Sequence, residues 1–433
     1  MTALIADAKI KNISAGSRGR LFFCDTVLQV NMEIRRTPPK RPRGGPSCLL
    51  VILVIAALVA GVFVISNADT VRETIILPPT PEPTRSSASY AASAALLERD
   101  GEIGDAIEAY EQAIRLDGSR IEFYLPLIDL LISTGKAEDA LNWSQQAVVL
   151  APENDQAWSA LAGAYLAQGN RLAETGDPTN ADLAYAEAVR AARSSTELNQ
   201  SNAKSWAYLA GALSQLGTEQ YARAQEAAEI ALTIDPDNPI VRLNMATVLE
   251  LQGFYPAAIE QYQLALDQNP NMSELHIGLA YNYYATRDIP TAILTFQDAL
   301  DIDPANAAAY DGLGWMFFLI GEYPSAEENL VKAVELDPEM VRAHAHLGAA
   351  YYRNLNYDSA IPELEMAVDQ YDNVTVANST YFNMLGLAYY FKGEENCDQA
   401  IPLFRQVLET MPEDVNALEG LELCRAAVIE SDS

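Results

Sequence analysis

The sequence predicts an all-α protein: a solenoid of helical hairpins in a right-handed superhelix, preceded by one transmembrane helix and a Pro-rich linker. Three observations lead to this prediction. Alanines recur about every 34 residues from Ser87 onward, a single uncharged apolar run occupies 49–65, and prolines are concentrated between the two. With 433 residues, of which 49% are hydrophobic, the chain is too apolar for a disordered acidic tail.

The charge of the chain excludes one class of partner. There are 28 Lys+Arg against 59 Asp+Glu, a formal net charge of −31. Nucleic-acid binding requires a basic face that neutralises phosphates, so we expect no nucleic-acid partner. Attraction of basic protein segments is the more natural consequence of this charge.

Residues 48–66 predict the transmembrane helix. The apolar run nearly reaches the roughly 20 residues that a bilayer needs. Basic residues are concentrated before the run, so the positive-inside rule predicts a cytoplasmic N-terminus. Everything after Ser66 is then extracytoplasmic, and the protein is a single-pass protein of a bacterial cytoplasmic membrane. The alternative is a signal peptide cleaved after Ala68, but the run is long for a signal peptide's apolar region, usually about 7–15 residues.

Two further segments flank this helix. Residues 1–47 form a basic cytoplasmic segment, and 1–31 show no recognisable pattern, so translation from Met32 and a short segment of unknown use remain equal alternatives. Residues 67–86 are rich in Pro, Thr and Ser and predict an extended polyproline spacer.

Nine similar units fill residues 87–414, each with a first helix and a second helix that begins near an alanine. These alanines are Ala106, Ala140, Ala188, Ala224, Ala258, Ala292, Ala326, Ala360 and Ala400. The third unit carries fourteen extra residues around 169–180, which predicts longer helices or a protruding loop. Residues 415–433 predict a capping helix and tail, whose polar face shields the last hairpin.

The unit resembles the tetratricopeptide repeat, whose pattern W-x-x-L-G-x-x-Y…A-x-x-x-F…P has a 34-residue period. Matching residues in this chain include Trp158, Leu161, Ala162 and Tyr165 in one unit and Tyr310, Leu313, Gly314, Phe317, Gly321, Ala326, Ala333 and Pro338 in another. The resemblance covers about 87–414. It implies a protein-binding array whose first helices line a concave groove.

No motif for catalysis, nucleotide binding or metal binding occurs in the chain, so we expect neither an enzyme nor a cofactor. The three histidines, His276, His344 and His346, favour structural roles. Cys397 and Cys424 fall on the last second helix and the cap. A disulfide and two unpaired core thiols both remain open for them, because sequence alone does not set their separation.

The predicted groove is lined by the second, fifth, ninth and twelfth residues of each unit. In the first five units these positions hold no aromatic residue and include Ala207, Gly211 and Ser214. In the last four units they include Tyr281, Tyr284, Trp315, Phe318, Tyr352 and Tyr390. These six residues are the candidate partner-binding site, because Tyr and Trp give large contact areas at low entropy cost. The alternative is packing between repeats.

We therefore expect a non-enzymatic, membrane-tethered scaffold that binds proteins or peptides, including basic segments, in its groove. The groove has only isolated Lys204 and Arg342 as cations, so a clamp for acidic C-termini is excluded. Two other functions remain open: a substrate-positioning subunit of an envelope enzyme complex, and a secreted structural solenoid released by signal cleavage.

Overall fold

The computed structural model describes residues 48–66, 85–371 and 373–431, and the chain divides into two units at residues 83 and 84. Within the described residues every regular element is helical: twenty α-helices and two short 3-10 helices. The predicted all-α class is confirmed. The described part of the first unit is one apolar helix, α1 (Cys48–Ser66).

The prediction of a transmembrane span is wrong, and so is the predicted single-pass location with an extracytoplasmic repeat domain. Among the described residues, no helix combines the length and the apolarity that crossing a bilayer requires. Segment 1–47 and most of linker 67–86 lie outside the described residues, as do the start at Met32 and the cleavage site at Ala68.

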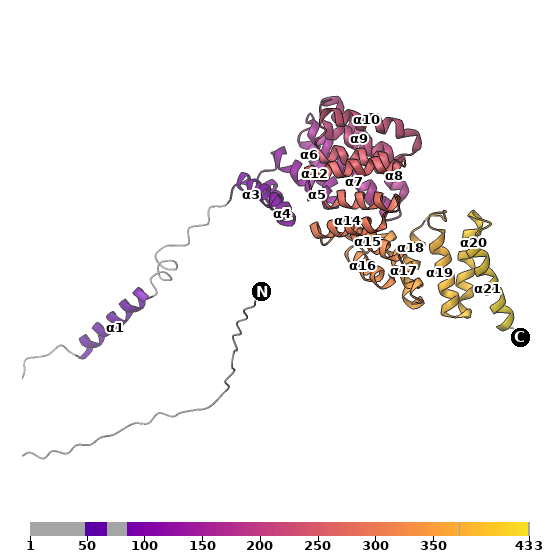
Figure 1. Cartoon of the computed structure of the whole chain (residues 1–433). Helices are drawn as coiled ribbons and strands as arrows, with labels where there is room; N and C mark the ends of the chain where they lie inside the picture. The colour runs from indigo at the N-terminus through magenta and orange to yellow at the C-terminus, as the bar shows by residue number, and fades with distance from the viewer. Residues whose placement is uncertain (1–47, 67–84, 372, 432–433) are drawn as a thin grey trace, which may run out of the picture. The chain divides into compact units, whose positions relative to one another are not determined.

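The second unit is a stack of helical hairpins in sequence order (Figure 1). Its eighteen helices α3 to α20 pair into nine hairpins within the described residues, and neighbouring hairpins pack on one another. The pairs are α3 (Ser87–Arg99) and α4 (Ile103–Leu116), α5 (Ile121–Ser133) and α6 (Ala137–Leu150), α7 (Asp155–Glu174) and α8 (Pro178–Leu198), α9 (Ala203–Gln215) and α10 (Tyr221–Ile234), α11 (Pro239–Leu251) and α12 (Tyr255–Gln268), α13 (Ser273–Ala285) and α14 (Ile289–Ile302), α15 (Ala307–Leu319) and α16 (Tyr323–Leu336), α17 (Val341–Arg353) and α18 (Tyr357–Gln370), α19 (Ser379–Lys392) and α20 (Cys397–Thr410).

Local sequence signals explain where these helices begin and turn. Asn202 and Asn306 cap α9 and α15, because each side chain accepts a hydrogen bond from a first-turn backbone N–H. The turn between α15 and α16 contains Gly321 with φ 84°, a conformation that costs glycine little. Within that hairpin Gly314 lies against Leu330, and a Cβ at Gly314 would come within 2.6 Å of the leucine side chain. The small residue therefore allows the close approach of α15 and α16.

The fourteen extra residues of the third unit lengthen both of its helices. α7 has 20 residues and α8 has 21, against 13 and 14 in α9 and α10. Of the two predicted outcomes, longer helices are observed. The tip of this hairpin, at 171–177, therefore reaches beyond its neighbours.

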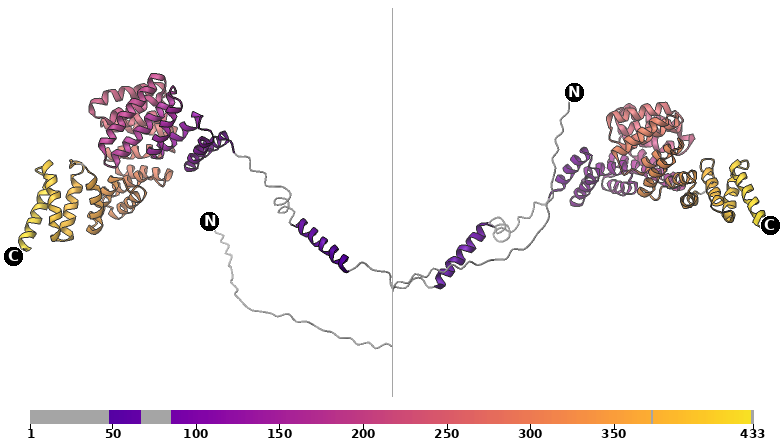
Figure 2. Two further views of the ribbon diagram at one scale, coloured as in Figure 1. Left: turned by 180° about the vertical axis from the view of Figure 1, so that it is seen from behind. Right: turned by 60° about the horizontal axis from the view of Figure 1, so that its bottom comes forward.

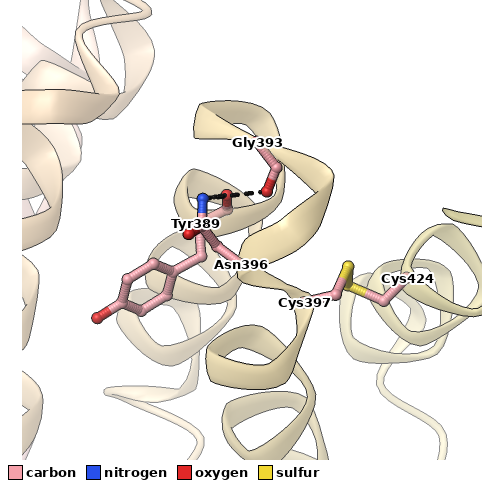
Figure 3. Close-up of a disulfide and its surroundings, with 5 residues drawn as sticks. All are labelled: Tyr389, Gly393, Asn396, Cys397 and Cys424. Atoms are coloured by element: carbon pink, nitrogen blue, oxygen red, sulfur yellow. Dashed lines mark hydrogen bonds between the residues drawn. A yellow bond between two sulfur atoms is a disulfide. The ribbon is translucent and has the colours of Figure 1, made fainter. Parts of the chain in front are cut away.

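A final helix, α21 (Val415–Ser431), packs on α20 and α19 (Figure 2). Cys397 at the start of α20 and Cys424 on α21 form a disulfide, with Cα atoms 5.4 Å apart (Figure 3). Both cysteines are buried. Of the two possibilities that the sequence left open, a disulfide and two unpaired thiols, the structure has the disulfide. This bond links the last helix covalently to the last hairpin.

Candidate functional site

The inner face of the array is formed by the first helices, since those of successive hairpins contact one another along the stack. In the N-terminal half these contacts are close at two glycines. A Cβ at Gly163 would lie 2.7 Å from the Tyr208 ring, and one at Gly211 would overlap Asn244. Ala207, Gly211 and Ser214 are accordingly buried, so their predicted position on an exposed groove wall is wrong. Small residues at these positions allow neighbouring first helices to approach closely.

In the C-terminal half the predicted aromatic residues lie on α13, α15, α17 and α19. Of the six, Tyr284 is exposed, at 36%, and the other five are partly buried: Tyr281, Trp315, Phe318, Tyr352 and Tyr390. They do not form one continuous strip. Ring contacts place Trp315 and Phe318 in an inner group and Tyr352 and Tyr390 in an edge group.

The inner group is a stack of rings centred on Trp315. Phe318 lies on one side with a centroid distance of 4.7 Å, and His346 stacks at 4.1 Å. Two ring contacts of Trp315 are thus made within the protein. Tyr281 packs edge-on against Phe296 at 5.1 Å. We conclude that Trp315 and Tyr281 are held by packing to a large degree.

The edge group lies where the first helices α17 and α19 end. Tyr352 contacts Tyr357 at 5.8 Å, Tyr357 stacks on Phe391 at 5.3 Å, and Phe391 meets Tyr390 at 5.4 Å. Phe391 is 49% exposed. These four rings therefore form an aromatic surface beside the turns of the last two hairpins, and a partner protein can reach this surface.

A buried charged cluster lies next to the inner group. Asp311 on α15 has no solvent exposure, and its two oxygens are each 2.7 Å from a nitrogen on α17: Oδ2 from Nε of Arg342 and Oδ1 from Nδ1 of His346. The Arg342 guanidinium also lies 5.6 Å from the Tyr281 ring centroid, a cation–π distance. The isolated Arg342 of the predicted groove is therefore paired.

Burial alone would raise the pKa of the Asp311 carboxyl. The charges of His346 and Arg342 outweigh burial and hold that pKa at about 2. The carboxylate is ionised at neutral pH and can only accept. The hydrogen bond therefore runs from the N–H at Nδ1 of His346 to the Asp311 carboxylate. Glu174 of α7 faces the same cluster. Burial raises the pKa of Glu174, although Arg342 and Arg171 act in the opposite direction.

Glu174 belongs to the tip of the long α7–α8 hairpin, which contacts the eighth unit. The Arg171 guanidinium forms a bidentate ion pair with Asp337, before α17, and its Nη2 is 3.4 Å from Glu339. At the tip, a Cβ at Gly176 would meet the carbonyl of Gln370, which ends α18, at 3.1 Å. We call residues 171–177 and these partners the clasp. It joins segments 166 residues apart and covers part of the inner face near Asp311.

Sequence reasoning missed the clasp and the charged cluster, although one signal pointed to the cluster. Arg342 and Asp311 occupy the second and fifth positions of their units, which the repeat pattern assigns to the inner face. A lone cation among apolar neighbours needs a carboxylate partner. In the described part of the chain, no group of three or more His, Cys, Asp or Glu residues has the arrangement of a metal site.

Nine stacked helical hairpins, whose first helices form the inner face, define a helical-repeat array. Two tetratricopeptide repeat families match the sequence, one described as "Tetratricopeptide repeat" at 91–155, 209–273 and 277–328 and one as "TPR repeat" at 314–354. These segments of the chain are tetratricopeptide repeats. No curated protein matches it in sequence.

Solved structures match this chain at low identity, and one of the three below has a TM-score above 0.5. The crystal structure of the APC/C hetero-tetramer Cut9-Hcn1 matches with a TM-score of 0.55 and 18% identity over 72% of this chain, which spans 58% of the matched chain. Pseudomonas aeruginosa pilF matches at 16% identity, over 51% of this chain and 96% of its own, with a TM-score of 0.45. Yeast Tom70 matches at 15% identity, over 80% and 96%, with a TM-score of 0.39. These likenesses concern the fold alone.

Proposed function

We propose that this protein is a non-enzymatic scaffold that binds an extended segment of a partner protein along its C-terminal hairpins. The observation that carries the proposal is the set of accessible aromatic side chains on the first helices α13, α17 and α19: Tyr284, Tyr352 and Tyr390, with Phe391 beside Tyr390. Half-exposed aromatic residues supply binding energy when a partner covers them. The tetratricopeptide repeats are a second argument for a protein-binding function.

The six aromatic residues have different roles under this proposal. Tyr284, Tyr352 and Tyr390 contact the partner directly. Phe318, Trp315 and Tyr281 have a packing role, since their rings contact other rings of the array. A basic partner segment fits the net charge of −31.

The test is partner capture by the triple variant Tyr284→Ala, Tyr352→Ala, Tyr390→Ala, with crosslinking in a cell extract and quantification by mass spectrometry. Truncating an aromatic anchor commonly costs about 2 kcal/mol, so capture falls by a factor of roughly thirty or more. Leu294→Ala removes a side chain that is 61% exposed on the second helix α14, and it leaves capture intact. A triple variant that melts like the wild type and still captures the same partners refutes the proposed surface.

A further inference from the structure

A polar pocket of about 530 Å³ lies in the N-terminal half of the array, away from the aromatic surface. It is built from α5, the first turns of α7 and α9, and the loops before α9 and α11. Its volume is in the range typical of ligand sites, roughly 300–1,000 Å³. The residues that matter for its chemistry are Asp129, Asp155, Asp235, Lys204 and Ser159. Their side chains give the pocket a formal charge of −2.

The three carboxylates keep acceptor capacity. Asp155 Oδ2 accepts from the side-chain amides of Asn199 and Asn202 at 3.0 and 2.8 Å, and Asp235 Oδ2 accepts from Asn238 at 3.1 Å. No donor among the described residues bonds the Oδ1 atom of either aspartate. The asparagines therefore orient each carboxylate and leave its second oxygen available.

Ser159 gives an independent indication of a ligand. Its side chain is only 4% exposed and lines the pocket, and its hydroxyl has no hydrogen-bond partner within the described protein. Leaving a buried hydroxyl unpaired costs about 1–3 kcal/mol, and such groups are uncommon in folded proteins. A ligand that enters the pocket can satisfy this hydroxyl.

One cation of the chain already occupies part of this site. The ammonium of Lys204 lies 2.7 Å from Asp129 Oδ2, and both side chains are partly exposed to solvent. The pocket thus binds a cationic group in the free protein. A second cation meets two further carboxylates and the Ser159 hydroxyl, and it competes with Lys204 for Asp129.

We propose that this pocket binds a guanidinium group, the side chain of an arginine in a partner peptide. A guanidinium presents five N–H donors in a planar fork, which suits several acceptors arriving from different helices. An ammonium offers three donors from a single point and engages fewer of these acceptors. The site shares no residue with the aromatic surface, so either proposal can fail without the other.

The experiment titrates the full chain, labelled with ¹⁵N-tryptophan, with an acetylated and amidated Gly-Arg-Gly peptide. The indoles of Trp158 and Trp206 lie on the helices that carry Ser159 and Lys204, and Trp315 belongs to the distant C-terminal stack. The first two indole signals shift on binding and that of Trp315 does not. The citrulline peptide, a neutral isostere, binds at least tenfold more weakly, and the lysine peptide binds severalfold more weakly. Equal binding of the arginine and citrulline peptides overturns the proposal.

Three variants separate this site from a structural role. Asp235→Asn lowers the affinity for the arginine peptide three- to tenfold, whereas Lys204→Gln raises it by a similar factor because the internal competitor is gone. Ser159→Ala weakens binding and raises the melting temperature of the free protein, since it deletes an unpaired hydroxyl. If Lys204→Gln leaves the affinity unchanged or lowers it, the pocket does not bind cations in this way and the assignment is rejected.

Discussion

The size of the ninth residue of each unit controls how closely successive first helices approach. Gly163 and Gly211 occupy this position in the third and fourth units and lie against side chains of the next first helix. In the sixth and seventh units the same position holds Tyr281 and Trp315. A bulky ring keeps neighbouring helices apart, whereas glycine lets them touch. In these four units the ninth residue therefore distinguishes closely packed first helices from more widely separated ones.

At the residue scale, Asp311→Asn tests the buried charged cluster. Removing one partner of a buried ion pair strands the other, so we expect a loss of about 3 kcal/mol in the free energy of unfolding at neutral pH. Chemical denaturation followed by circular dichroism measures this loss. Asp298→Asn, which changes an exposed carboxylate on α14, shifts the stability by no more than about 0.5 kcal/mol.

The pH dependence of the Asp311 contribution has a definite sign. The folded-state pKa of about 2 lies below the ordinary aspartate value of 3.8, so the ionised form is favoured in the folded protein. Its contribution is complete above about pH 4 and is lost as the pH falls through about 2. The stability difference between wild type and Asp311→Asn therefore narrows on acidification. A difference that is constant between pH 6 and 3, or already absent at pH 6, contradicts this account.

At the element scale, the clasp depends on the added length of α7 and α8. At 1.5 Å per residue, the seven residues that α7 has beyond α9 extend it by about 10 Å, which brings Arg171 to Asp337. A bidentate arginine–carboxylate pair fixes both distance and orientation. The clasp thereby connects the third unit to the seventh through Asp337 and to the eighth through Gln370, which nearest-neighbour stacking alone does not do.

Arg171→Met tests the clasp. The substitution removes the ion pair but keeps an apolar side chain of similar length, so we expect faster amide hydrogen exchange at 171–177 and at 337–342. The global stability falls by only about 1–2 kcal/mol, because the hairpins keep their neighbours. Arg190→Met is the matched control, since the exposed partner of Arg190, Glu187, lies on the same helix. Unchanged exchange at both segments in the Arg171 variant shows that the clasp does not hold them.

At the scale of the whole molecule, a repeat array unfolds in parts. The disulfide closes a loop between residues 27 apart, which by loop entropy stabilises the end of the array by about 3.5 kcal/mol. Cys424→Ala therefore increases hydrogen exchange in α20 and α21 and leaves α5 to α10 unchanged. Adding a reductant to the wild type reproduces the effect, whereas adding it to the variant has no further effect. Loss of protection throughout the array contradicts the local nature of this contribution.

The sequence by itself determined the helical hairpins and their order. The alanines, turn glycines and capping asparagines act over a few residues, so they can be recognised along the chain. The repeat pattern assigned Arg342 and Lys204 to groove positions. It also predicted that the third unit is enlarged. The apolar run at 49–65 predicted a helix, which is present as α1, but the inference of a membrane span from it is wrong.

Only the tertiary structure decided which residues of distant units contact one another. The pairing of Arg171 with Asp337 joins units four places apart, and the convergence of Glu174 on Arg342 joins units five places apart. Cys397 and Cys424 form a disulfide only because of how α20 and α21 are placed. The burial of Ser159 likewise depends on how the neighbouring helices are placed. Each unit adds a small rotation to the stack, and these rotations accumulate over many residues. A 34-residue pattern records the repeating unit but not the accumulated rotation, so contacts between distant units follow only from the folded array.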